Sequence, residues 1–170
     1  MKQFLVVATA LLLTTHVFAE VIPASDSRVV YVGRTQVVGA DVSFDWTATY
    51  FRIAFSGESL TMKASETKWD ADADKAATRH NYYNVWIDSP TSAAPHRIIE
   101  VAGNDTVIEL IDPMYLKKSR RAVHEVIVQK RTEGEQGKTT IHEFATDKRG
   151  EFFQAEPLKV RQLEFIGDSY

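Results

Sequence analysis

Apolar and polar residues alternate along most of the chain after residue 40, which is the pattern of β-strands with one buried face. Val42, Phe44 and Trp46 fall on one face of the first such strand, and Ser43, Asp45 and Thr47 fall on the other. Further runs occupy residues 51–55, 60–64, 83–87, 98–101 and 106–111. The residues expected to point inward in the next three strands are Phe51, Ile53 and Phe55, then Leu60, Met62 and Ala64, then Tyr83, Val85 and Ile87.

Two later runs are predicted to form a hairpin. Residues 122–129 and 138–145 flank Gly134-Glu135-Gln136-Gly137, which has the composition of a turn. A last pair of aromatic residues, Phe152 and Phe153, precedes Pro157.

These strands predict an all-β fold, an antiparallel two-sheet β-sandwich or jelly roll over residues 20–156. A parallel sheet would need helices of about ten residues or more between its strands, and most of the gaps are too short for them. Two segments are open to other readings. Residues 64–80 form a long loop or a short helix, and residues 112–121 have room for a helical turn or two.

The N-terminus has the organisation of a secretory signal. Lys2 provides a positive charge, residues 4–13 are apolar, and Val17-Phe18-Ala19 suits a cleavage site before Glu20. The apolar run is too short to span a membrane as a helix. We therefore expect residues 1–19 to be a cleaved signal peptide and the protein to be secreted or periplasmic.

Composition narrows the classes of function. The chain has 170 residues, 44% of them hydrophobic, which is enough to bury a core. Removal of residues 1–19 takes away Lys2 and changes the net charge from −3 to about −4, so a nucleic-acid partner is not expected. The absence of cysteine excludes disulfides, thiol catalysis and thiolate metal sites.

The candidate catalytic chemistry lies at residues 161–170. The run Arg161-Gln162-Leu163-Glu164-Phe165-Ile166 is predicted as a strand, and Gly167-Asp168-Ser169 follows it as a turn. Several hydrolases place a nucleophilic serine in such a turn, although the same three residues also make ordinary turns. Ser169 would need a general base within hydrogen-bond reach to act as a nucleophile.

Other polar motifs favour structural roles. Residues 70–74 alternate aspartate and alanine, but an EF-hand loop starting at Asp70 would place Lys75 and Asn81 where glycine and glutamate are required. No metal site and no cofactor are expected. The histidines at positions 80, 96, 124 and 142 lack the helical spacing of a zinc site, and His124 and His142 are interpreted as neighbours across the predicted hairpin. The basic residues at positions 117, 118, 120 and 121 indicate an exposed turn.

Several aromatic residues suit either sugar binding or core packing. Trp46, Tyr82, Tyr83 and Trp86 have rings that stack on sugars when they are exposed, and Tyr82 and Trp86 share one face of their strand. Burial in the core is the commoner fate of large aromatic residues in strands.

A set of ordered motifs resembles the N-terminal domain of carbohydrate esterase family 2. The motifs are Tyr31-Val32-Gly33-Arg34, Phe55-Ser56-Gly57-Glu58-Ser59-Leu60, Tyr82-Tyr83-Asn84-Val85-Trp86-Ile87-Asp88, Gln129-Lys130-Arg131-Thr132-Glu133-Gly134 and Glu164-Phe165-Ile166-Gly167-Asp168-Ser169-Tyr170. The resemblance extends over residues 28–170.

The resemblance implies a secreted enzyme that removes acetyl groups from plant polysaccharides such as xylan or glucomannan. A jelly-roll domain would pack against an SGNH-type α/β hydrolase domain that begins within residues 157–170. Ser169 would be the nucleophile and one oxyanion donor, with Gly167 and Asp168 in its turn. The family's histidine base and further oxyanion donors belong to later blocks, so residues 1–170 alone are expected to be inactive. The alternative is a secreted carbohydrate-binding β-sandwich without catalysis.

Overall fold

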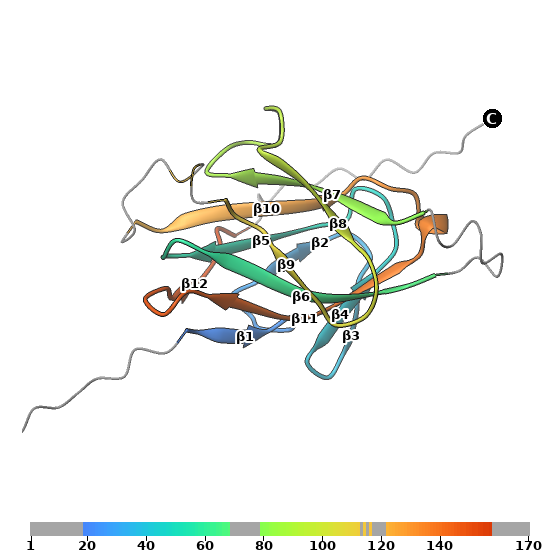
Figure 1. Cartoon of the computed structure of the whole chain (residues 1–170), viewed down its shortest axis with the longest axis horizontal. Coiled ribbons are helices and arrows are strands. Elements are labelled where there is room, and N and C mark those ends of the chain that lie inside the picture. Colours follow the sequence, from blue (N-terminus) through green and yellow to red (C-terminus); the bar gives the residue numbers. More distant parts are fainter. Residues whose placement is uncertain (1–18, 69–78, 113, 115, 117–121, 158–170) are drawn as a thin grey trace, which may run out of the picture.

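The structure, a computed structural model, describes residues 19–68, 79–112, 114, 116 and 122–157. Two antiparallel sheets pack face to face (Figure 1). The first sheet, called here the β11 sheet, contains β1 (Val21–Pro23), β3 (Gln36–Val38), β4 (Asp41–Phe44), β6 (Leu60–Thr67), β9 (Thr106–Glu109) and β11 (Lys138–Thr146). The second, called the β10 sheet, contains β2 (Val30–Val32), β5 (Tyr50–Phe55), β7 (Asn81–Ile87), β8 (Arg97–Val101), β10 (His124–Lys130) and β12 (Phe152–Phe153).

The strand order is that of a jelly roll. Four strands run β4-β11-β6-β9 in one sheet, and four run β5-β10-β7-β8 in the other. Taken in chain order, the first of these eight strands pairs with the last and the second pairs with the seventh, which is the double Greek-key arrangement of this fold. The predicted all-β jelly-roll sandwich is confirmed.

The core lies between the sheets and is built from the predicted inward residues. Phe51, Ile53 and Phe55 are fully buried, and Leu60, Met62 and Ala64 face them from the other sheet. Aromatic rings fill the centre, with Phe51 and Phe144 5.2 Å apart between ring centroids. Period-2 patterning predicted these positions because one face of each strand is excluded from water.

The predicted hairpin of residues 122–129 and 138–145 is wrong, although both strands exist. β10 pairs with β5 and β7, whereas β11 pairs with β4, β6 and β1 in the opposite sheet. The connection between them, which includes the short 3-10 helix η2 (Gly134–Gln136), crosses from one sheet to the other. Consequently His124 and His142 are not cross-strand neighbours.

The strand predicted through Trp46 ends earlier than expected. β4 stops at Phe44, and Trp46 lies in the following loop with 56% of its surface exposed. The open segment 64–80 begins as strand, because β6 continues to Thr67. Residues 69–78 and most of 113–121 lie outside the described residues, as do 1–18 and 158–170.

The two ends of the sandwich domain are joined by one acidic side chain. Glu20 Oε2 accepts a hydrogen bond from the amide N–H of Phe152 at 2.7 Å, and Glu20 Oε1 pairs with Arg28 Nη1 at 2.8 Å. Arg28 Nη1 also donates to the carbonyl oxygen of Phe152. The start of β1 and the edge strand β12 are therefore held side by side.

Candidate functional site

The predicted nucleophile Ser169 and its turn residues Gly167 and Asp168 lie outside the described residues. Their role stays a prediction. The described part of the chain offers polar side chains at both ends of the sandwich and on its outer faces.

A buried lysine organises one end of the sandwich. Lys130 follows Val126 and Val128 on the inward face of β10 and is 1% exposed. Its ammonium group donates hydrogen bonds to the carbonyl oxygens of Thr132 and Glu133, each at 2.9 Å. Burial lowers the pKa of Lys130 to about 8, while the nearby carboxylates of Asp45, Glu133 and Glu66 oppose that shift. This ammonium group holds the start of the crossover between the sheets.

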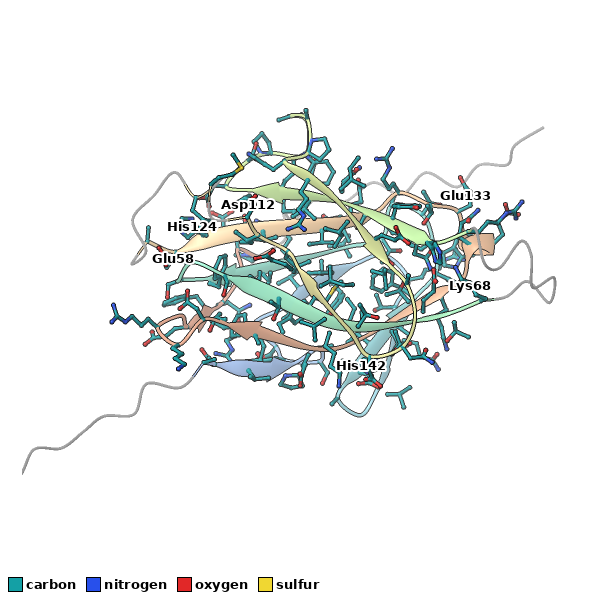
Figure 2. The ribbon with its side chains drawn as sticks, viewed as in Figure 1. Glu58, Lys68, Asp112, His124, Glu133 and His142 are labelled. Atoms are coloured by element: carbon teal, nitrogen blue, oxygen red, sulfur yellow. The ribbon has the colours of Figure 1, made fainter. Side chains whose placement is uncertain are left out.

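Glu66 is the second buried charge at this end. Its Oε1 accepts hydrogen bonds from the backbone and the side-chain amide of Asn81 at 2.9 and 2.8 Å. Its Oε2 lies 2.7 Å from Lys68 Nζ and 3.2 Å from His80 Nδ1. Figure 2 shows Lys68 and Glu133 at this same end of the sandwich. Every carboxylate oxygen of Glu66 is occupied, which is the arrangement of a structural buried charge.

A histidine–aspartate pair lies at the opposite end (Figure 2). His124 Nδ1 is 2.8 Å from Asp88 Oδ2, and the imidazole ring packs 5.7 Å from the ring of Phe55. The other ring nitrogen, Nε2, is buried without a hydrogen-bond partner. His124 shares the inward face of β10 with Val126, so this nitrogen is directed into the protein interior. The pair lacks the access to solvent-borne substrate that a general base requires.

Three strands of the β11 sheet bring together a serine, a histidine and an aspartate. Ser65 Oγ lies 2.8 Å from His142 Nε2, and His142 Nδ1 lies 3.1 Å from Asp41 Oδ1. The connectivity is that of a catalytic triad. However, Ser65 Oγ also accepts a hydrogen bond from the amide N–H of Asp105. The backbone N–H groups around a strand residue belong to the sheet ladders, so this surface is poorly suited to form an oxyanion hole.

Sequence patterning missed this group because its members come from β4, β6 and β11. Only the strand order makes them neighbours. We interpret the three side chains as a polar tie across the sheet. Lys130 was also missed as a buried charge, although its even spacing from Val126 and Val128 was a usable signal.

The aromatic residues considered for sugar stacking do not form one surface. Tyr83 is buried and donates a hydrogen bond to Thr139 Oγ1, and Trp86 is 3% exposed with its indole N–H bonded to the carbonyl oxygen of Ala93. Trp46 is exposed, and the Arg34 guanidinium lies 4.7 Å from its ring centroid. Tyr82 is 37% exposed. Tyr83 therefore packs in the core, whereas Trp86 is buried on the opposite face of β7, beside Ala93.

Within residues 19–68, 79–112 and 122–157, no cluster of three or more His, Asp or Glu side chains has the arrangement of a metal site. The same part of the chain contains no helix of sufficient length and apolar character to span a membrane. The acidic run at 70–74 and the basic run at 117–121 lie outside it.

Comparison with known proteins places these observations in a family. Residues 31–156 match the family model described as carbohydrate esterase 2 N-terminal. An acetylxylan esterase / glucomannan deacetylase of Cellvibrio japonicus is 29% identical over 128 residues, covering 75% of this chain and 29% of that protein.

Solved structures have the same fold. A family two carbohydrate esterase from Cellvibrio japonicus superposes with a TM-score of 0.65 at 21% identity, covering 84% of this chain and 37% of the other. A family two carbohydrate esterase from Clostridium thermocellum, solved in complex with cellohexaose, gives 0.61 at 16% identity, covering 78% and 35%.

This chain thus spans about a third of the length of these relatives. The family match covers most of the sandwich, from β2 to the residues that follow β12, and it includes Lys130, Thr132 and Glu133 at the crossover. The chain belongs to the carbohydrate esterase 2 N-terminal family.

Proposed function

We propose that this chain is the N-terminal part of an enzyme that removes acetyl groups from a polysaccharide such as xylan or glucomannan. The observation that carries the proposal is the match to the acetylxylan esterase / glucomannan deacetylase, which extends over 75% of this chain. The family match over residues 31–156 supports it. The cellohexaose bound to the Clostridium thermocellum esterase supports a carbohydrate as the class of substrate.

In the proposed reaction, the Ser169 hydroxyl attacks the acetyl carbonyl carbon. A histidine from the hydrolase domain accepts the hydroxyl proton and later returns it to the sugar oxygen that leaves. Backbone N–H groups, including that of Ser169, stabilise the negative charge of the tetrahedral intermediate. Water then attacks the acetyl-serine and releases acetate.

The sandwich contributes no base to this reaction in our proposal. Of the described histidines, His124 is buried, and His80, His96 and His142 are each bonded to neighbouring groups. Its role is that of a rigid accessory domain. Residues 1–19 would direct export to the periplasm or the medium, residues 20–156 would form the sandwich, and residues 157–170 would lead into the hydrolase domain with Ser169 in its first turn.

The test uses the product of the complete gene with acetylated xylan and acetylated glucomannan, measuring released acetate. We expect Ser169→Ala to reduce kcat/KM by at least about 10³-fold, because the covalent step is lost. Ser65→Ala is the matched control, since Ser65 has the only described triad-like contacts, and it should leave kcat/KM unchanged. Activity that survives Ser169→Ala would overturn the assignment of the nucleophile.

A further inference from the structure

The loop that joins β4 to β5 holds a tryptophan in contact with solvent. Trp46 is 56% exposed, whereas Trp86 on β7 is 3% exposed. Tryptophan is strongly buried on average, because its indole ring is large and mostly apolar. A single exposed apolar side chain is nevertheless ordinary at a protein surface. The groups around Trp46 therefore decide whether it belongs to a site.

The loop is tied to the crossover that begins after β10. The amide N–H of Ala48 donates a hydrogen bond to the carbonyl oxygen of Lys130 at 2.9 Å. Thr47 Oγ1 donates to the carbonyl oxygen of Thr132 at 3.0 Å. These two bonds flank the Trp46 side of the loop and hold its backbone against the body of the sandwich.

The backbone of the same loop is also constrained from within. Ala48 has φ +65, a left-handed conformation that costs free energy in any residue other than glycine. Gly33 packs so closely against the loop that a Cβ at this residue would lie 2.8 Å from Thr49 Oγ1. The loop therefore presents Trp46 in a fixed conformation, and a ligand that stacks on the ring would lose little free energy to ordering of the protein.

A guanidinium group accompanies the exposed ring. Arg34 Cζ lies 4.7 Å from the centroid of the Trp46 ring, which is a cation–π contact. Arg28 and Arg52 each pair with a glutamate. In the described part of the chain, by contrast, Arg34 makes no ion pair and its side chain donates no hydrogen bond. Its N–H donors are available to a ligand beside the indole ring.

Carboxylates lie on the other neighbours of Trp46. Asp45 precedes it in the chain, and Glu133 Oε2 accepts a hydrogen bond from Thr47 Oγ1 at 3.2 Å. Figure 2 labels Glu133 at this end of the sandwich. Together with Arg34, these groups supply hydrogen-bond donors and acceptors of opposite charge. Such surroundings favour neither an anion nor a cation, and they suit a neutral molecule with many hydroxyl groups, because a hydroxyl both donates and accepts.

We propose that Trp46 and Arg34 form a binding site for a neutral pyranose unit of a polysaccharide. The face of the indole ring carries partial negative charge, which attracts the polarised C–H groups on the apolar face of a sugar ring. The Arg34 guanidinium would donate hydrogen bonds to hydroxyl oxygens at the edge of that sugar. The identity of the polysaccharide as xylan or glucomannan rests on the proposed function, whereas binding of the sugar requires no catalysis.

The experiment titrates the 170-residue chain with xylohexaose and follows the indole N–H signals by NMR. The chain has three tryptophans, and the signal of Trp46 is identified by its loss in Trp46→Ala. We expect the Trp46 signal to shift on addition of xylohexaose and the signal of buried Trp86 to stay in place. Trp46→Ala should weaken binding at least about 10-fold through loss of the stacking surface, and Arg34→Ala at least about 3-fold through loss of hydrogen bonds.

Two further variants separate stacking from other effects. Trp46→Tyr keeps an aromatic ring and should retain most of the affinity, which shows that the loop is still folded. Ile98→Ala is the matched control, because Ile98 on β8 is exposed to a similar extent, 52%. It should bind xylohexaose as the wild type does.

Three results would overturn the site. They are a Trp46 signal that does not move at millimolar xylohexaose, an affinity that is the same in Trp46→Ala as in the wild type, and an equal loss of affinity in Ile98→Ala. Tighter binding of an acidic oligogalacturonate than of xylohexaose would overturn the assignment to a neutral sugar.

The two proposals fail in different ways. In the product of the complete gene, Trp46→Ala should raise KM for acetylated xylan and leave hydrolysis of a small aryl acetate unchanged. If the complete protein releases acetate but Trp46 does not contact xylohexaose, the sugar site is wrong and the proposed function stands. If the 170-residue chain binds xylohexaose through Trp46 but the complete protein releases no acetate, the sugar site stands and the proposed function is wrong.

Discussion

At the scale of single residues, the buried ammonium group of Lys130 has the clearest energetic consequence. Two carbonyl oxygens bind it, yet burial lowers its pKa from the ordinary value of 10.5 to about 8. The unfolded chain therefore binds more protons than the folded protein between these two values. By linkage, the contribution of Lys130 makes the fold more stable as pH rises through this window.

We predict that the free energy of unfolding of the wild-type chain, relative to that of Lys130→Met, increases by on the order of 2 kcal/mol between pH 8 and pH 10. Denaturant unfolding at several pH values measures the difference. Lys148→Met, at an exposed lysine in the turn after β11, is the control and should follow the wild type. If the free energy of unfolding changed equally with pH in the wild type and in Lys130→Met, Lys130 would not titrate in this range.

Ser65 provides a second test at this scale. Its contacts with His142 and the Asp105 amide tie strands together, and we assign them no role in catalysis. Ser65→Ala should lower the free energy of unfolding by about 1 kcal/mol through lost hydrogen bonds. Neither the wild-type 170-residue chain nor this variant should hydrolyse an aryl acetate. Hydrolysis that disappears with Ser65→Ala would mean that the surface triad is a working esterase site.

At the scale of elements, the crossover from β10 to β11 takes the chain from one sheet to the other. Gly137, at its end, has φ +125, and a Cβ there would lie 2.5 Å from the carbonyl oxygen of Thr67. Both the backbone conformation and the close approach require glycine. The crossover is therefore fixed at both ends, by Lys130 at its start and by Gly137 where β11 begins.

Gly137→Ala should destabilise the fold by about 3 kcal/mol, because a strained backbone and a clash with β6 add together. The control is Gly39→Ala, where φ is +62 and nothing lies within 4 Å of the added Cβ. That change should cost only about 1 kcal/mol, the cost of the left-handed conformation. Thermal unfolding measures the loss of stability in both variants. Equal losses would show that the backbone around residue 137 moves away from Thr67 at no cost.

The same crossover shows what patterning predicts about elements. Alternation after residue 40 predicted the strands from β4 to β11 and their buried faces, because burial of one face is a local property of the sequence, but the short strands β1, β2 and β3 were not predicted. Pairing is not local. The glycine-containing segment at 134–137 looks like a hairpin turn, but β10 pairs with β5 and β7 in the other sheet. The loop position of Trp46 escaped prediction for the opposite reason, since alternation continues by chance past the last ladder bond.

At the scale of the whole molecule, the jelly-roll order makes the fold depend on its late strands. β11 is central in its sheet and pairs with β4, β6 and β1. A chain that ends at residue 137 lacks this strand and should not fold, whereas a chain that ends at residue 156 retains every described strand. Near-ultraviolet circular dichroism and amide dispersion by NMR distinguish the two. An unfolded 1–156 chain would show that residues 157–170 belong to the sandwich, contrary to the proposed boundary.

For the candidate site as well, the sequence predicted some features and left others untested. The sequence predicted the family from a set of ordered motifs, one of which contains Lys130 and Thr132 at the crossover, and it predicted the jelly roll from strand patterning. The assignment of Ser169 stays a prediction, since its chemistry depends on partners that belong to later blocks of the family. No pattern within residues 1–170 predicts the distances between Ser169 and those partners.

The contacts of Glu20 with Arg28 and Phe152 affect how the sandwich domain is built into larger proteins. Because this carboxylate joins Arg28 to the backbone of Phe152, the chain enters and exits the sandwich at neighbouring points. Such a module can be inserted between other segments, or removed from them, with little rearrangement of its hosts.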